Sequence, residues 1–166
     1  MNSQQTGRIM LIGPAPSRDS DPTDPLTPGR SNRGTGACLL RLLDMDLETF
    51  RMVFERHYLL PSHQGRHKGG DKLPRRLARK ASDNMSESIM GRTVVLVGIK
   101  TARAFSIEHT APFKWMTVAG ANMAWIQNPS GINHWWNDHG NRKIGETFLS
   151  TLGQQSFNMA LRGLAV

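Results

Sequence analysis

Residues 93–97 have the sequence TVVLV, a run of β-branched and aliphatic residues that ends at Gly98. Because both faces of such a run are apolar, it predicts a strand buried in a sheet that is covered on both sides. Gly98 and Ile99 predict a tight turn, and residues 101–107 predict the short helix that follows it. A buried strand, a turn and a helix form the repeating unit of a parallel α/β sheet.

The rest of the chain repeats this alternation. Apolar runs predict further strands at 8–12 and 57–60, and one or two more within 114–118 and 123–126. Helical spacing of apolar residues predicts helices at 37–45, 47–55, 74–90 and 143–152, the last with a continuation toward 161. Ligands bind beyond the carboxyl ends of the strands in such sheets. The loops after the first and last strands, 13–36 and 128–134, are therefore expected to lie together.

Composition bounds the class of protein. The chain has 166 residues, the size of one ordinary domain, and 38% of them are hydrophobic, enough for a single core. No apolar run approaches the roughly 20 residues that span a bilayer. Residues 1–7 are polar, are expected to be flexible, and lack the apolar segment of a signal peptide. The single cysteine, Cys38, excludes an internal disulfide and an all-cysteine metal site. We expect one cytoplasmic domain, residues 1–166, with no membrane partner, metal or cofactor.

Positive charge is concentrated in one segment. The chain carries 21 Lys and Arg against 13 Asp and Glu, a net charge of +8, which favours an anionic partner and nucleic acid first of all. Residues 62–80 hold seven of the basic residues against one Asp, a net charge of +6. Such a run is either a solvated loop leading into an exposed helix face or a loop that follows phosphates.

Two loops carry the other candidate site residues. Three aspartates, Asp19, Asp21 and Asp24, follow the turn GPAPS at 13–17. They are either solvated acids on a proline-stiffened turn or the source of a carboxylate held over a ligand. The glycine-rich segment 29–36 precedes a predicted helix and is a weak indication of phosphate binding. The segment NPSGINH at 128–134 is either a turn leading into a capped helix or a ligand-binding loop.

Taken in order, these motifs resemble those of the uracil-DNA glycosylase superfamily. The segment IGPAPS at 12–17 is similar to the glycine-x-alanine-proline loop after the family's first strand. The segment NPSG at 128–131 is similar to the second catalytic motif in the mismatch-specific thymine/uracil branch. Three further stretches lie between them and resemble segments of the family. They are 25–26 together with 34–40 (GTGACLL), 58–61 (YLLP) and 95–102 (VLVGIKTA). The resemblance covers residues 8–152 and rests on five motifs in the family's order.

The resemblance implies a three-layer α/β/α sandwich around a short, mainly parallel four-stranded sheet. It also implies an enzyme that flips a base out of DNA and then cleaves its N-glycosidic bond. In the family, a residue of the second motif hydrogen-bonds the departing base, and the loop after it inserts an apolar wedge into the duplex. Here these roles fall to Asn128 and Ile132. DNA is then the partner, and the protein is expected to be a monomer.

The first motif departs from the family's pattern. Branches of the family have an acidic residue or Asn where this chain has Pro14 and Ala15. Asp19 or Asp21 is therefore expected to position the attacking water, with Asp24 behind them. Leu26 stands where the family has an aromatic residue that stacks on the base, and Tyr58 where it has an Asn that reads uracil. These changes predict that the substrate is a modified or damaged base, with a pyrimidine as the first candidate.

The sequence thus predicts three sets of site residues. The catalytic set is Asp19, Asp21 and Asn128. The base-binding set is Gly13, Ala15, Pro16, Leu26, Tyr58 and Asn128. The DNA-binding set is Ser130, Gly131, Ile132, Asn133 and His134 in the last loop, with Arg66, Lys68, Lys72 and Arg75 in or beside the basic loop 62–74. Two other functions stay open: a non-catalytic nucleic-acid-binding protein on the same scaffold, and a hydrolase of free nucleosides or nucleotides.

Overall fold

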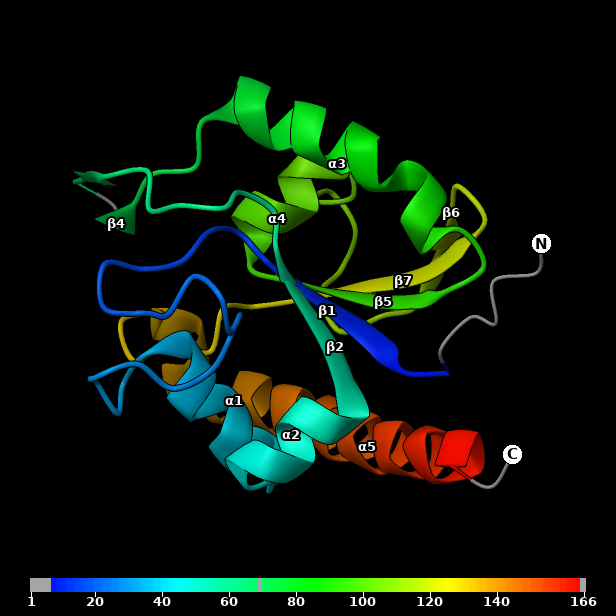
Figure 1. Cartoon of the computed structure of the whole chain (residues 1–166). Coiled ribbons are helices and arrows are strands. Elements are labelled where there is room, and N and C mark those ends of the chain that lie inside the picture. The colour runs from blue at the N-terminus through cyan, green and yellow to red at the C-terminus, as the bar shows by residue number, and fades with distance from the viewer. Residues whose placement is uncertain (1–6, 69, 165–166) are drawn as a thin grey trace.

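A five-stranded sheet forms the centre of the molecule (Figure 1). The computed structural model describes residues 7–68 and 70–164, the last two by their backbone alone. In spatial order the strands are β2 (Phe54–Tyr58), β1 (Ile9–Gly13), β5 (Thr93–Val97), β7 (Ala121–Ile126) and β6 (Met116–Val118). The first four run parallel, and β6 runs antiparallel to β7.

Helices cover both faces of this sheet. On one face lie α3 (Arg75–Ile89) and α4 (Ile99–Ala104), and on the other lie α1 (Thr35–Leu43), α2 (Leu47–Val53) and α5 (His139–Leu164) (Figure 1). Successive strand residues point to opposite faces. In β5, Val94 and Leu96 therefore pack with α3 and α4, whereas Val95 and Val97 pack with the other three helices. The predicted three-layer α/β/α sandwich is confirmed.

The predicted count of four strands is wrong, because β6 adds a fifth at the sheet edge. Ala119 and Gly120 connect β6 to β7 with φ angles of 48° and 77°. Two consecutive positive φ angles give the turn that suits a two-residue β-hairpin. Alanine is uncommon at the first of these positions, so the sequence pattern could not distinguish one strand from two in this region.

One boundary error concerns the junction of α2 and β2. The helix predicted at 47–55 ends at Val53, and the strand predicted at 57–60 begins at Phe54. Asp46 caps the start of this helix, because its Oδ1 accepts a hydrogen bond from the N–H of Thr49 at 2.7 Å. β2 is an edge strand in which only Phe54 is fully buried, so its sequence FERHY lacks the apolar run of an interior strand.

Other elements also differ from their predicted bounds. α1 and α4 each begin two residues before the predicted helices, and α5 begins at His139 and continues to Leu164. The basic loop predicted at 62–74 contains a short hairpin of β3 (Arg66–His67) and β4 (Gly70–Asp71). Of the residues predicted to be flexible, 1–6 lie outside the described part of the chain. Among the helices that the structure describes, none combines the length and the apolar character needed to cross a bilayer.

An ion-pair network ties β2 to the residue before β5. Arg92 donates to both carboxylate oxygens of Glu55, at 2.5 Å and 3.2 Å. His57 Nε2 lies 2.8 Å from Glu55 Oε1. The hydrogen bonds from Arg92, with a further one from His57, outweigh the effect of burial and lower the pKa of Glu55 to about 2.

We expect this network to make folding stability depend on pH in acid. The ordinary pKa of 4.5 applies to Glu55 in the unfolded chain, so the stabilisation is complete above that value and is lost as the pH falls toward the folded pKa of about 2. From about pH 6 to about pH 3, the wild type should lose about 2 kcal/mol more unfolding free energy than Glu55→Gln. Urea unfolding at several pH values measures the difference. Equal losses in the two proteins would contradict the assignment.

Candidate functional site

The carboxyl ends of the parallel strands form one edge of the molecule. Loops 14–34 and 127–133 follow β1 and β7 at this edge. The hairpin of β3 and β4 lies on the same side (Figure 1). The two loops were predicted to lie together, and direct contact confirms it, because the N–H of Gly131 donates to the carbonyl of Arg33 at 3.0 Å.

Asn128, predicted to contact the departing base, is held in one orientation. Its Oδ1 accepts hydrogen bonds from Thr35 Oγ1 at 2.7 Å and from the N–H of Ser130 at 3.2 Å. Because a backbone N–H only donates, the side-chain atom that faces Ser130 must be the oxygen of the amide. The Nδ2 group then points away from these partners, and it donates no hydrogen bond to the described residues. Asn128 therefore has a free donor on a fixed amide.

The loop from Asn128 to Asn133 is tied together around this amide. The backbone carbonyl of Asn128 accepts from Asn133 Nδ2 at 2.9 Å and from Trp136 Nε1 at 3.1 Å. The N–H of Asn133 donates to the carbonyl of Ser130 at 3.0 Å. Ile132 lies between Ser130 and Asn133 in the sequence, and 72% of its surface is exposed. A well-connected loop thus holds an apolar side chain in solvent, a few residues from the free amide donor.

The residues predicted to bind the base form a second cluster at the ends of β1 and β2. The N–H of Leu26 donates to Tyr58 Oη at 3.2 Å, which leaves the Tyr58 hydroxyl proton available for a ligand. The Leu26 side chain fills the space beside Gly13, where a methyl group would come within 2.7 Å of Leu26 Cδ2. Ala15 and Pro16 continue the loop, half-buried and buried respectively.

Leu26 also stores strain. Its φ is 60°, and its side chain is only 3% exposed. A left-handed conformation costs a non-glycine residue about 1 kcal/mol or more, and such residues concentrate at functional sites. The buried side chain and the hydrogen bond to Tyr58 hold this residue in place.

The start of α1 joins the two clusters. Thr35, its first residue, binds Asn128. Gly36, the next residue, packs so closely on the preceding loop that a methyl group there would lie 2.3 Å from the carbonyl of Thr27. The structure thus brings Asn128, Leu26 and Tyr58 to one edge. No hydrogen bond joins Tyr58 to Asn128 within the described residues.

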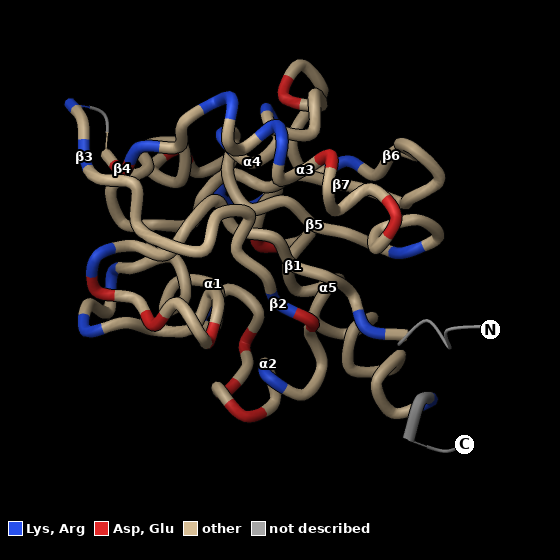
Figure 2. Tube along the Cα trace, turned by 45° about the horizontal axis from the view of Figure 1, so that its top comes forward, with Lys and Arg blue, Asp and Glu red and all other residues tan. Residues whose placement is uncertain are grey.

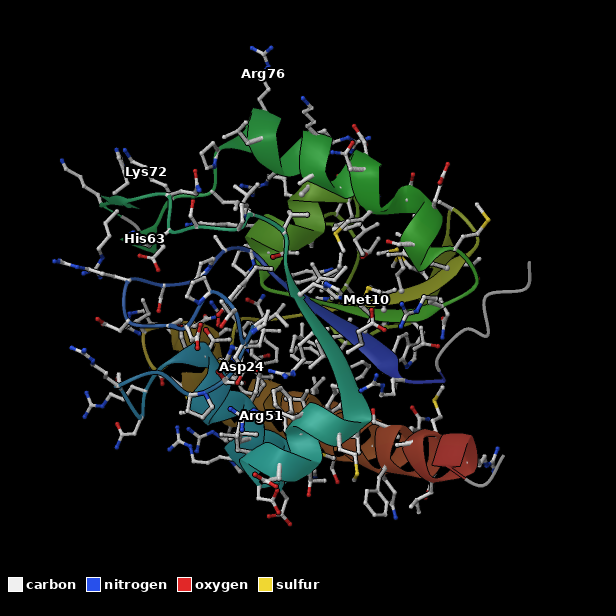
Figure 3. The ribbon with its side chains drawn as sticks, viewed as in Figure 1. Met10, Asp24, Arg51, His63, Lys72 and Arg76 are labelled. Carbon is white, nitrogen blue, oxygen red and sulfur yellow. The ribbon has the colours of Figure 1, made fainter. Side chains whose placement is uncertain are left out.

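Asp24 is an anchor of the first loop. Its carboxylate forms an ion pair with Arg51 at 2.6 Å (Figure 3) and another with Arg56 at 2.5 Å. Burial alone would raise the pKa of Asp24, but the hydrogen bonds from the two guanidinium groups outweigh it and lower the pKa below its usual value. Both oxygens of the carboxylate are occupied, so Asp24 holds the loop to α2 and β2.

Asp19 and Asp21 lie on the outer surface of the same loop, where both are exposed. Asp21 Oδ1 accepts from the hydroxyl and the N–H of Thr23, at 2.7 Å and 2.8 Å, and these hydrogen bonds lower the pKa of Asp21. Among residues 7–68 and 70–164, no hydrogen bond or ion pair joins either aspartate to Asn128 or Tyr58. The two acids predicted to position water are not brought into contact with the rest of the site.

The predicted DNA-binding cations project from the hairpin and the helix after it. Arg66, Lys68, Lys72 and Arg75 are all exposed. Figure 2 shows Lys and Arg on this hairpin and on the loops at the same side of the molecule. Lys100 Nζ donates to the carbonyl of Asp71 at 2.5 Å and so links the hairpin to α4.

Three residues at this edge had no role in the sequence prediction. Thr35 orients Asn128, Arg33 holds Gly131 through its backbone, and Arg30 adds an exposed cation to the same loop. The glycine-rich segment 29–36 before a helix was a partial signal for all three. The hydrogen bond itself could not be expected, because Thr35 and Asn128 are 93 positions apart.

Two grooves lie away from Asn128 and Tyr58. The larger, of about 490 Å³, is mostly apolar and lies between α5 and the segment before β6. The smaller, of about 250 Å³, is lined by residues of α3 and α4 and of the segments next to them. Across the described residues, His, Cys, Asp and Glu side chains do not gather in any group of three that could hold a metal ion.

No protein-family model and no curated protein matches the chain. The fold and the edge define an α/β protein with an open, mainly parallel sheet and a cluster of polar loops at its strand ends. Its activity has to be inferred from the geometry of that edge.

Proposed function

We propose that this protein is a DNA glycosylase that hydrolyses the N-glycosidic bond of a flipped base that is modified or damaged, with a pyrimidine as the first candidate. The loop from Asn128 to Asn133 carries the proposal, because it holds, four positions apart in the sequence, a fixed amide with a free donor and an isoleucine that is 72% exposed. The net charge of +8 and the exposed cations of the hairpin support DNA as the ligand. The protein acts as a monomer in the cytoplasm and without a cofactor.

In this proposal Ile132 acts while the base is flipped out of the duplex, and Asn128 acts on the base as its bond is cleaved. Removing a base from the stack costs a few kcal/mol, and an apolar side chain inserted in its place offsets part of that cost. Water adds to C1′ of the sugar and loses a proton to the solvent, while the base leaves with the electron pair of the broken bond and is then protonated. Asn128 Nδ2 donates to an oxygen of the base, where this charge develops. Because Thr35 and Ser130 already hold its oxygen, the amide does not have to reorient.

The test is an excision assay on oligonucleotides that carry uracil, hydroxymethylated pyrimidines or glycosylated pyrimidines. Alkali cleaves the abasic sites that form. The wild type should produce cleavage at one of these bases. Asp19→Asn or Asp21→Asn, whichever residue positions the water, should lower the rate about 100-fold or more. No product from any substrate, while DNA binding is intact, would refute excision.

A non-catalytic DNA-binding protein on the same scaffold is the second candidate. The placement of the acids favours it: Asp24 is occupied by two arginines, and Asp19 and Asp21 are exposed. This candidate predicts salt-sensitive binding that is unchanged in Asp19→Asn and Asp21→Asn. The excision panel therefore separates the two functions.

Neutralising the hairpin should weaken DNA binding without changing which base is chosen. Arg66, Lys68 and Lys72 are exposed, and they lie on or next to the hairpin of β3 and β4, a segment separate from the loop of Asn128. Phosphate contacts carry no sequence information, so the triple Gln variant should bind every duplex more weakly, with a salt dependence lower by about one for each contact removed. Titrations at several salt concentrations measure this. A change in base selectivity would instead place the hairpin in the base pocket.

Ile132→Ala should lower the excision of a paired base about tenfold, and that of a base in single-stranded DNA much less. The side chain is 72% exposed, so stability should stay within about 0.5 kcal/mol of the wild type. Ile144→Ala is the matched control, because Ile144 is 56% exposed on α5. Equal excision rates for Ile132→Ala and Ile144→Ala on duplex substrate would contradict the wedge.

A further inference from the structure

A small groove beside the hairpin gathers positive charge from two helices. Its volume is about 250 Å³, and its charged lining residues are Arg75, Arg79, Lys100, Arg103 and Glu108. Arg75 and Arg79 lie on α3, whereas Lys100 and Arg103 lie on α4. Four cations therefore surround the groove against one carboxylate.

These cations are only partly neutralised. Arg79 Nε lies 3.3 Å from Asp83, and Arg103 Nε lies 4.0 Å from Glu108. Within the described part of the chain, no acid forms an ion pair with Arg75 or Lys100. The groove thus keeps a surplus of positive charge that the protein's own acids do not compensate.

The walls of the groove are held by hydrogen bonds. Ser82 of α3 is 5% exposed, and its Oγ donates to the carbonyl of Ala104 of α4 at 2.7 Å. Arg79 donates to the same carbonyl at 3.4 Å and also to the hydroxyl of Ser106. Lys100 is held by the carbonyl of Asp71. The cations are therefore presented on a connected scaffold, which lowers the entropy lost when they bind an anion.

We propose that this groove is a phosphate-binding site. Arg forks and Lys ammonium groups are the usual protein ligands of phosphate oxygens. A volume of 250 Å³ is smaller than the usual pocket for a drug-sized ligand and suits one or a few phosphate groups without a base. The phosphate comes either from a free polyphosphate or from the backbone of bound DNA. The site does not depend on base excision, because binding alone defines it.

The test measures binding of inorganic tripolyphosphate, and separately of an unmodified DNA duplex, by calorimetry on the full chain. Arg75→Gln and Arg103→Gln should each weaken tripolyphosphate binding about threefold to tenfold. Glu108→Gln removes the one negative charge of the groove and should strengthen tripolyphosphate binding by a similar factor. Lys143→Gln is the control, because it removes one exposed charge from α5, away from this groove.

The two ligands identify the source of the phosphate. If the groove binds the DNA backbone, Arg75→Gln and Arg103→Gln also weaken duplex binding and lower its salt dependence by about one each. If it binds free polyphosphate, duplex binding by Arg103→Gln equals that of Lys143→Gln. The proposal is overturned if neither ligand distinguishes these arginine variants from Lys143→Gln, or if Glu108→Gln fails to tighten tripolyphosphate binding.

Discussion

Asn128→Asp is expected to lower the rate of base excision about 100- to 1,000-fold, with DNA affinity within about threefold of the wild type. The aspartate keeps an oxygen that can accept from Thr35 and Ser130, so the loop keeps its shape. The other side-chain atom changes from a donor to an acceptor. It would then face a leaving base that is gaining negative charge. Single-turnover excision on the active substrate separates this loss from any change in binding.

Thr35 provides the matching variants, because it acts through Asn128. Thr35→Val removes the hydroxyl that donates to Asn128 Oδ1 at 2.7 Å and leaves the amide less firmly oriented. We expect about a tenfold loss in the single-turnover rate. Thr35→Ser keeps a hydroxyl and should recover most of the rate. A wild-type rate in Asn128→Asp would show that this amide does not act on the base, whatever the state of Thr35.

The interior elements of the fold could be predicted because their signals are local. β5 has the bounds expected from TVVLV, and α3 begins and ends within one residue of its prediction. β2 could not be predicted in this way. It lies at the sheet edge, where Glu55 forms an ion pair with Arg92 and a hydrogen bond with His57 instead of packing in the core. An edge strand of this kind has no apolar run, so its first residues were assigned to the preceding helix.

The candidate site shows the same division between local and distant signals. The two loops could be placed together, because the strand ends of a parallel sheet share one edge. The partners of individual side chains could not be predicted. Asp24 is neutralised by Arg51 and Arg56, which are 27 and 32 positions away. A pairing over that distance leaves no periodic pattern, so the sequence could not separate this anchoring acid from Asp19 and Asp21.

Gly36→Ala is expected to destabilise the protein by about 3 kcal/mol, which would lower the melting temperature by about 6–12 °C for a chain of this size. The new methyl group would lie 2.3 Å from the carbonyl carbon and oxygen of Thr27 and 2.6 Å from the carbonyl oxygen of Leu26. These are backbone atoms, so they cannot yield by a side-chain rotation. Either α1 or the loop has to move. Thermal and urea unfolding measure the cost.

Gly34→Ala is the control two residues earlier, where a methyl group would lie 3.5 Å from its nearest neighbour, the carbonyl oxygen of Ser31. It should cost about 1 kcal/mol or less, since Gly34 is the N-cap of α1 and makes no side-chain cap. Equal stability of the two variants would show that the backbone at Leu26 and Thr27 yields easily. The φ of 60° at Leu26 argues against this, because a strained residue persists only where its surroundings hold it. The contact at Gly36 therefore tests whether the loop carrying Asp19 and Asp21 is rigid enough to hold a carboxylate over a base.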